Sequence, residues 1–417
     1  MSEPSTPPRG GGGPEREDRR QPEEFRMSPN PIAGRYSRFR VADRLLLTGH
    51  SHQAWPDVGF EGQQRAWLDA AELVDEKWDA VAERTEVVAA GYRRLFGGCD
   101  GDMTIDANTH ALVVRFLSAL PLRDRPRIVT TRAEFHTVRR QLDRLAEEGV
   151  EVVKVPEAPL ATLAERVAAE VDDRTSCAMV SSVLYGSGLI VPGLHMVADA
   201  CARHGAELLV DAYHHLNVVP FDPAGLERAF LVGGGYKYCQ LGEGVCVMRV
   251  PADCDLRPVV TGWFSEFGEV AEAKVPGEVR YGRGAARFAG STFDPTSHYR
   301  AARVFGFFSE EGLDVPLLRA VSQHQLDVLI DTFLGMDVDP SVASLDDSVP
   351  RSSRAGFLAL RSPVAGALSR ALRERGVRTD FRGEMLRFGP APYLSDAQVR
   401  AAMEALGDTL RGGVPVS

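Results

Sequence analysis

Residues 206–251 read AELLVDAYHHLNVVPFDPAGLERAFLVGGGYKYCQLGEGVCVMRVP, and this stretch decides the fold. It holds three short apolar runs, at 206–212, 229–235 and 245–251, separated by segments rich in glycine, proline and aspartate. Apolar runs of this length that are bounded by turn residues are typical of buried β-strands. The stretch therefore predicts three strands of one sheet.

The chain upstream of this stretch alternates between similar apolar runs and helical patterns. Further strands are predicted at 127–131, 150–156 and 177–185, and amphipathic helices at 137–149, 160–172 and 193–205. Strands that alternate with helices indicate βαβ units. We therefore expect an α/β fold with a mostly parallel sheet.

Three segments of different composition divide the chain. Residues 1–30 are rich in proline, glycine and charge, which predicts a disordered tail because few apolar side chains could offset the entropy of ordering. Residues 31–297 contain the predicted sheet and form the expected large domain. Residues 298–417 change to long helical stretches with a few short strands, which predicts a small C-terminal α+β domain.

The composition excludes several classes of partner. Hydrophobic residues make up 44% of the chain and charged residues 25%, as in an ordinary globular protein. The 58 acidic residues outnumber the 48 basic ones, so we expect neither nucleic acid nor an anionic membrane as a partner. The six cysteines are scattered and no apolar run could span a bilayer, so we expect a soluble, cytoplasmic protein with reduced thiols and no bound metal.

Two polar residues follow predicted strands and could form a site. Asp211 ends the run at 206–212, and Lys237 follows the run at 229–235. Open parallel sheets bind ligands at the carboxyl ends of their strands. A carboxylate there could accept a hydrogen bond from a protonated ring nitrogen, and a desolvated lysine could act as an amine nucleophile. Each residue alone also fits an ordinary role, as a turn-capping aspartate or a solvated lysine.

With these residues the chain resembles the class V aminotransferase group of fold-type I enzymes that use pyridoxal 5'-phosphate (PLP), most of all the kynureninase branch. Asp211 and His214 are similar to the D-x-x-H motif of that branch, and residues 236–238 to its S-Y-K-Y. Residues 262–264 are similar to G-W-F/W, and Arg387 to the arginine of R-V-A-P-x-P-L-Y. The motifs stand in the family's order and extend over roughly residues 40 to 410.

The resemblance implies PLP fold type I and a PLP site. The large domain would carry a mostly parallel seven-stranded sheet, and N-terminal residues would join the small domain. Lys237 would hold PLP as a Schiff base and move the substrate's α-proton, while Asp211 would hold the pyridine nitrogen. The cofactor-binding residues implied are Asn108, Thr109, Phe135, His136, Asp211, His214, Tyr236, Lys237, Trp263, Ser291 and Thr292.

The implied residues have different tasks. Phe135 would stack on the ring, with His136 as the second candidate. Asn108, Thr109, Tyr236 and Trp263 would bind the phosphate, and His214 would lie near Asp211 unless it is a structural histidine. Ser291 and Thr292 would reach the phosphate of the neighbouring subunit, which implies a homodimer with shared active sites. Arg387 would bind the α-carboxylate of an amino-acid substrate.

Two departures from the kynureninase pattern concern the substrate side chain. Residues 48–52 read TGHSH where the family carries G-N-S. Residues 291–295 read STFDP where the family carries S-N-P-P. His50 and His52 are therefore candidate substrate-binding residues, with ordinary surface or capping histidines as the alternative, and no role is assigned to His215. A cysteine-persulfide mechanism is not expected, because the last cysteine is Cys254.

The function implied is removal of the α-proton of an α-amino acid followed by cleavage at the β-carbon. That cleavage would be kynureninase-like hydrolysis of a carbon–carbon bond or β-elimination at a carbon–sulfur bond. The alternatives are a class V aminotransferase, an epimerase, or a non-catalytic regulatory protein with the same fold.

Overall fold

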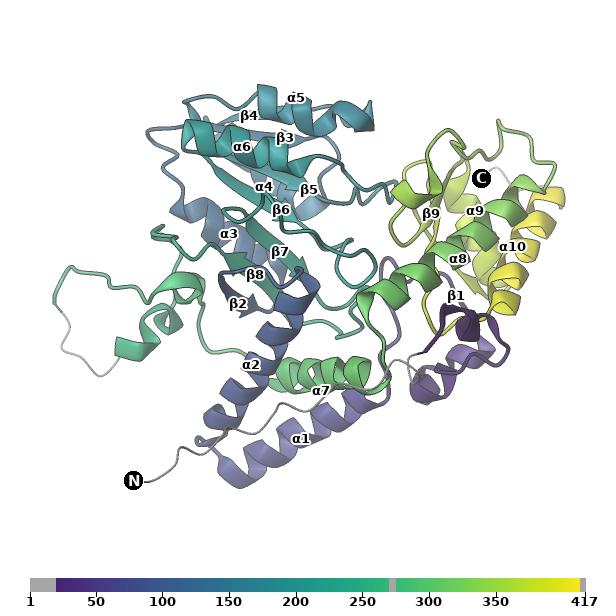
Figure 1. Ribbon diagram of the computed structural model, residues 1–417, viewed down its shortest axis with the longest axis horizontal. Coiled ribbons are helices and arrows are strands. Elements are labelled where there is room, and N and C mark those ends of the chain that lie inside the picture. Colours follow the sequence, from purple (N-terminus) through teal and green to yellow (C-terminus); the bar gives the residue numbers. More distant parts are fainter. Residues whose placement is uncertain (1–19, 270–274, 413–417) are drawn as a thin grey trace, which may run out of the picture.

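The computed structural model describes residues 20–269 and 275–412. The chain forms two domains that lie side by side (Figure 1). The large domain is built on one seven-stranded sheet of strand order β2-β8-β7-β6-β5-β3-β4. Its strands are β2 (Asp102–Asp106), β3 (Arg127–Thr131), β4 (Glu151–Val155), β5 (Thr175–Ser181), β6 (Glu207–Asp211), β7 (Phe230–Gly234) and β8 (Cys246–Val250). Strand β8 runs opposite to the other six strands and is antiparallel to both β2 and β7, which confirms the predicted mostly parallel sheet.

Six of the seven strands fall where apolar runs predict them. The seventh, β2, reads DMTID and lies at the sheet edge beside β8. Only Met103 and Ile105 are apolar in it, so it offers no continuous apolar run. The central strands β5, β7 and β8 are buried along their whole length, which is typical of a sheet covered on both faces.

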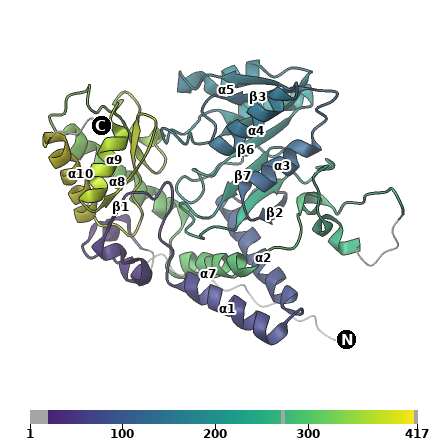
Figure 2. The same cartoon turned by 180° about the vertical axis from the view of Figure 1, so that it is seen from behind.

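Alternate strand residues face two different hydrophobic layers. In β5, Cys177 and Met179 pack with α3 and α4, whereas Ala178 and Val180 pack on the opposite face with α5 and α6. The two layers are visible from the two sides of the molecule (Figures 1 and 2). The helices of the large domain are α1 (Val58–Leu73), α2 (Lys77–Leu95), α3 (Thr109–Ala119), α4 (His136–Glu147), α5 (Leu163–Ala169), α6 (Leu194–His204) and α7 (Thr296–Glu310).

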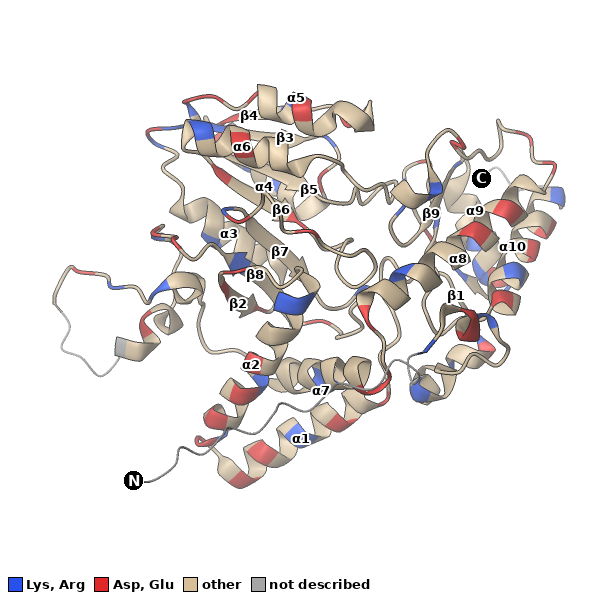
Figure 3. Cartoon of the chain, in the orientation of Figure 1, with Lys and Arg blue, Asp and Glu red and all other residues tan. Residues whose placement is uncertain are grey.

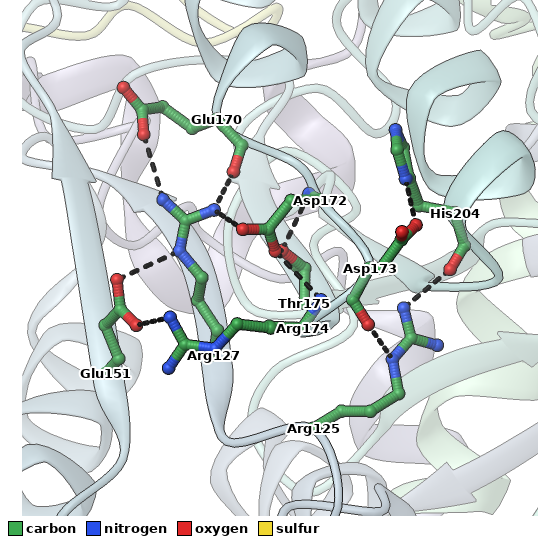
Figure 4. Close-up of polar contacts among 9 residues, drawn as sticks. All are labelled: Arg125, Arg127, Glu151, Glu170, Asp172, Asp173, Arg174, Thr175 and His204. Carbon is green, nitrogen blue, oxygen red and sulfur yellow. Dashed lines mark hydrogen bonds and ion pairs between the residues drawn. The ribbon is translucent and has the colours of Figure 1, made fainter.

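A network of ion pairs lies at the end of the sheet where the parallel strands begin (Figure 4). Arg127 at the start of β3 donates to Glu151 of β4 at 3.1 Å and to Glu170 at 3.1 Å, and pairs with Asp172 at 2.9 Å. Arg125 donates to the backbone oxygen of His204, at the end of α6. Arg127 and Arg125 thus both have hydrogen-bond or ion-pair partners at this end of the sheet.

The small domain contains a three-stranded antiparallel sheet, ordered β11-β12-β9, the short strand β10 and, among the described residues, three α-helices. Its elements are α8 (Val315–Leu334), β9 (Leu358–Arg361), α9 (Ala365–Glu374), β10 (Val377–Arg378), β11 (Asp380–Arg382), β12 (Met385–Phe388) and α10 (Asp396–Arg411). Helix α7 packs against α1 and α2 beside the large sheet.

The N-terminal segment joins the small domain, as the resemblance implied. Strand β1 (Leu45–Leu46) pairs in parallel with β10. Phe25, in the 3₁₀ helix η2 (Pro22–Arg26), is buried, and the Asn30 amide donates to the backbone oxygens of Phe25 and Pro392. The prediction of disorder is therefore wrong for residues 20–30, because Phe25 and Asn30 anchor them. The rest of the predicted tail, residues 1–19, lies outside the described residues.

Figure 3 shows acidic and basic residues interspersed along α1 and along α10. Within the two described ranges, no helix is long and apolar enough to cross a membrane.

Candidate active site

The loop after β7 brings Lys237 to the carboxyl end of the sheet. Strand β7 ends at Gly234, where an added Cβ would lie 2.5 Å from the Tyr213 hydroxyl oxygen and 2.6 Å from Cys246 Sγ. Only glycine fits between these two side chains, so the loop can run close to the strand ends. Three residues later the side chain of Lys237 is buried, with 6% of its surface exposed.

The environment of Lys237 favours a neutral amine. Its Nζ lies 2.8 Å from Nε2 of His214 and 4.4 Å from the centre of the Tyr213 ring. Burial lowers the pKa of Lys237 to about 7, although the negative charge of Asp211 opposes the shift. Burial also lowers the pKa of His214 well below its ordinary value, so His214 is neutral and can accept a hydrogen bond from Nζ.

Asp211 ends β6, next to β7 in the sheet. Its Oδ1 accepts a hydrogen bond from the backbone N–H of Tyr213 at 2.8 Å. Burial raises the pKa of Asp211, because the charged carboxylate is removed from water. A partly buried carboxylate with one hydrogen-bond donor can accept a further strong donor, such as a protonated ring nitrogen.

A pocket at this edge of the sheet unites six of the predicted residues. They are Thr109, Phe135, Asp211, His214, Tyr236 and Lys237. Thr109 begins α3, whose N-terminal N–H groups favour an anion such as a phosphate. The Asn108 amide oxygen caps the same helix by accepting from the N–H of Ala111 at 2.9 Å, so only its N–H groups are left for a phosphate.

Three predicted histidines lie around this pocket. His136 is exposed at the start of α4, with its ring 5.4 Å from that of Tyr185. His52 is exposed and stacks on Tyr236, with ring centres 4.9 Å apart. His50 is fully buried, and its Nε2 lies 2.8 Å from Oδ1 of Asp380. The neighbouring His215 has a structural contact, since its Nε2 lies 3.2 Å from the backbone oxygen of Pro220.

Arg387 is buried on β12 and already has a carboxylate partner. Its Nε and Nη2 donate to the two carboxylate oxygens of Asp380, at 2.8 and 2.7 Å. Its Nη1 donates to the backbone oxygen of Tyr185, a residue that lines the pocket, at 2.6 Å. Arg387 therefore reaches the wall of the pocket as part of an ion pair.

Trp263, Ser291 and Thr292 lie away from Lys237 within one chain. Trp263 begins η6 (Trp263–Glu269), is 43% exposed, and donates from Nε1 to Thr292 Oγ1 at 3.3 Å. Ser291 and Thr292 are exposed after η7 (Gly284–Phe288) and border a separate groove, also lined by Asp106. The structure of one chain thus does not bring these three residues to the pocket.

The sequence interpretation missed two carboxylates near the pocket, the partly buried Asp380 and the buried Glu134. Asp380 pairs with Arg387, and Glu134 accepts hydrogen bonds from Thr131 at 2.7 Å and from the Ser181 hydroxyl at 2.6 Å. Burial raises the pKa of Glu134 to about 7. Glu134 directly precedes Phe135 after a predicted strand, which is the kind of position that singled out Asp211.

Comparisons with known proteins agree with this architecture. Residues 318–406 match the family described as kynureninase C-terminal domain. An uncharacterized aminotransferase, YcbU, of Bacillus subtilis (strain 168) is 22% identical over 332 residues, which cover 79% of this chain and 85% of that protein.

Solved structures are similar over nearly their whole length. The apo cysteine desulfurase from Thermococcus onnurineus NA1 has a TM-score of 0.76 at 15% identity, covering 94% of this chain and 99% of that one. The cystine C–S lyase C-DES, in complex with its reaction product cysteine persulfide, has a TM-score of 0.75 at 16% identity, covering 88% and 98%. At this identity the likeness shows the fold.

Fold, site and comparisons point the same way. The chain shares the fold of these solved structures, one of which, a C-DES mutant, is described with glycine linked to its PLP cofactor. The C-terminal domain of this chain is kynureninase-like. The residues present also fit the cofactor, since the pocket joins a buried amine, a partly buried carboxylate, an aromatic ring and a helix N-terminus.

Proposed function

We propose that the protein is a PLP-dependent enzyme that removes the α-proton of an α-amino acid and cleaves a bond at the β-carbon. The observation that carries the proposal is the buried Lys237, whose Nζ is 2.8 Å from His214 in the same pocket as Asp211. When bound, PLP supplies an electron-withdrawing ring that stabilises negative charge at the substrate's α-carbon.

The residues of the pocket divide the task of holding the cofactor. Lys237 would bind it covalently, Asp211 would pair with its ring nitrogen, and Phe135 would cover one face of its ring. Thr109 and the N–H groups at the start of α3 would hold its phosphate, with the Tyr236 hydroxyl as a further donor. His136 and Asn108 stay candidates for holding the cofactor, and the exposed His52 and the buried His50 stay candidates for binding the substrate.

Lys237 can act as a proton acceptor that is oriented by His214. With a pKa of about 7, the Nζ of Lys237 is substantially unprotonated at neutral pH and can accept the substrate's α-proton. Nε2 of His214 accepts a hydrogen bond from Nζ and so orients its lone pair. Burial of both groups excludes water from the exchange.

Cleavage at the β-carbon is the outcome that the comparisons support best. The kynureninase match lies in the small domain, which supplies Arg387, and a C–S lyase shares the fold. The chain has no cysteine after Cys254, so no mobile C-terminal cysteine is present to accept sulfur. The aminotransferase relative favours transamination as the second candidate. Epimerisation and a non-catalytic role are the third and fourth candidates.

Product analysis separates these activities. The PLP-loaded protein would be incubated in D₂O with single amino acids, kynurenine and cysteine conjugates, each with and without 2-oxoglutarate as an amino acceptor, and the products identified by mass. Hydrolysis at the β-carbon yields alanine, β-elimination yields pyruvate and ammonia, transamination yields a 2-oxo acid of unchanged length, and epimerisation yields the D-amino acid. We expect alanine or pyruvate as the product. A product with an unchanged carbon skeleton would exclude β-cleavage. If no compound reacts, the non-catalytic role is the alternative that remains.

We also propose a homodimer with shared active sites. Trp263, Phe267 and Phe293 line an apolar cavity with Trp78 and Val81, and Trp263 and Phe267 are largely exposed in one chain. Burial of this surface by a second copy would stabilise the pair and could carry Ser291 and Thr292 to the partner's phosphate. Mixing Lys237→Ala with a Ser291→Ala, Thr292→Ala double variant tests this. Mixed dimers should regain activity that neither variant has alone, and a monomer in sedimentation would refute the proposal.

A further inference from the structure

Asp380 and Arg387 form a pre-paired carboxylate and guanidinium. They lie directly opposite each other across the antiparallel strands β11 and β12. Nε of Arg387 donates to Oδ1 of Asp380 at 2.8 Å, and Nη2 donates to Oδ2 at 2.7 Å. Two parallel hydrogen bonds of this length are the geometry with which arginine also binds a ligand carboxylate.

His50 fixes Asp380 from the other side. The distance between His50 Nε2 and Asp380 Oδ1 is 2.8 Å, and Nε2 must donate because an ionised carboxylate only accepts. The His50 ring stacks on Phe357 with centres 4.5 Å apart, and the Arg387 guanidinium lies 5.5 Å from the centre of the same Phe357 ring. Although burial opposes ionisation, the hydrogen bonds from His50 and Arg387 hold the pKa of Asp380 well below its ordinary value.

This cluster lies at the wall of the pocket that contains Lys237. Arg387 donates to the backbone oxygen of Tyr185, and Tyr185 lines the pocket together with His214. The Phe357 ring that supports His50 lies 5.8 Å from the ring of His214. A ligand held near Lys237 would therefore meet Arg387 with Asp380 already bound to it.

Three of the five N–H groups of Arg387 are used by Asp380 and Tyr185. A ligand carboxylate must displace Asp380 or lie beside it as a second negative charge. Both are costly, because like charges repel in a buried site and Asp380 would lose its partner. A primary amine without a carboxylate meets neither cost.

We propose that Asp380 is a specificity-determining residue, an internal carboxylate that competes with a ligand's carboxylate for Arg387. The site then accepts primary amines that lack an α-carboxylate about as well as the corresponding α-amino acids. This inference rests on the proposed function, and it extends the substrate class of the same site to primary amines.

A pair of probes tests the competition. L-alanine and ethylamine differ by one carboxylate, and each would be titrated into the PLP-loaded protein at one pH while the cofactor's absorbance reports binding. Dissociation constants are referred to the unprotonated amine. In the parent protein the two constants should agree within about tenfold. Asp380→Asn should bind L-alanine on the order of tenfold tighter or more and leave ethylamine unchanged, because the competing charge is gone.

Matched variants separate competition from a general charge effect. Glu384→Gln removes a negative charge from the same hairpin, where Glu384 pairs with the exposed Arg361, and should bind both probes like the parent. Asp380→Ala should resemble Asp380→Asn, and Arg387→Lys should weaken L-alanine alone because lysine lacks the planar fork. Thermal unfolding of each variant checks the fold.

Several results would overturn the proposal. The first is a parent protein that binds L-alanine more than a hundredfold tighter than ethylamine, a test that needs no variant. The second is a folded Asp380→Asn protein with unchanged or weaker affinity for L-alanine. If the protein takes up no PLP, the proposed function fails, and calorimetry with propionate still decides whether Asp380→Asn strengthens carboxylate binding.

Discussion

The Nζ of Lys237 lies 2.8 Å from Nε2 of His214, and both side chains are buried. The other ring nitrogen of His214, Nδ1, has no hydrogen-bond partner among the described residues. Burial disfavours the protonated form of each of these two groups. Burial of Lys237 thus keeps its amine ready to react with a carbonyl compound.

Uptake of PLP should follow the titration of this amine. A lysine reacts with an aldehyde only when it is unprotonated, and the pKa of Lys237 is lowered from 10.5 to about 7. The rate at which the cofactor-free protein takes up PLP should therefore rise between about pH 6 and 8 and then level off. Stopped-flow absorbance would measure it. A rate that keeps rising toward pH 10 would indicate an ordinary lysine.

Neutralising Asp211 should slow chemistry more than binding. Asp211→Asn keeps the size of the side chain and an oxygen for the Tyr213 N–H, but it lacks the charge that pairs with a protonated ring nitrogen. We expect α-proton exchange in D₂O, followed by mass, to fall at least about 100-fold at full cofactor occupancy. Asp199→Asn, on the exposed face of α6, is the control for charge loss. Unchanged exchange in Asp211→Asn would mean that another group holds the ring.

Glu134 should make the protein less stable as pH rises. Its pKa is raised to about 7 in the folded chain, whereas an unfolded glutamate titrates near 4.5. Between these values the folded state holds a proton that the unfolded state has lost, so the free energy of unfolding falls as pH increases. The loss amounts to roughly 3 kcal/mol.

Glu134→Gln should remove this part of the pH dependence. The amide keeps an acceptor for Thr131 and the Ser181 N–H, and the Ser181 hydroxyl can rotate to accept from it. Urea unfolding at pH 5 and pH 7.5 would give the difference between parent and variant. Equal pH slopes for the two proteins would show that Glu134 titrates normally.

The contact between α1 and α7 depends on Gly62. A Cβ at this position would lie 2.7 Å from the backbone oxygen of Tyr299 and 2.9 Å from Cα of Arg300. Since backbone cannot yield as a flexible side chain can, Gly62→Ala should cost about 1–3 kcal/mol of unfolding free energy in urea. Gly34→Ala, with no atom within 4 Å of the new Cβ, should be neutral. Equal stability of the two variants would refute the close packing.

The sheet and the core of the site could be predicted because both depend on local patterns. Asp211 and Lys237 end or follow apolar runs, and the parallel sheet brings such residues to one edge. The edge strand β2 could not be found, because only two of its five residues are apolar.

Other parts of the site depend on relationships that a linear pattern does not state. To predict the pair of Asp380 and Arg387, one must know the register of the hairpin around Gly383. Two opposite charges seven residues apart, with a glycine between them, were nevertheless a usable signal of such a hairpin. The cap made by Asn108 was also readable, from a helix that begins directly after it. Trp263 and Thr292 do not line the pocket of Lys237 in one chain, so the role proposed for them would need a second copy of the chain.

The central claim is that Lys237 binds PLP covalently. The chain has four lysines, Lys77, Lys154, Lys237 and Lys274, so the other three serve as internal controls. Of the described lysines only Lys237 is buried, and Lys154 is paired with Asp143. Reduction of the PLP-loaded protein with borohydride, followed by peptide mapping by mass, should place one pyridoxyl group per chain on Lys237. A label on another lysine, or no label after saturation with PLP, would contradict the account.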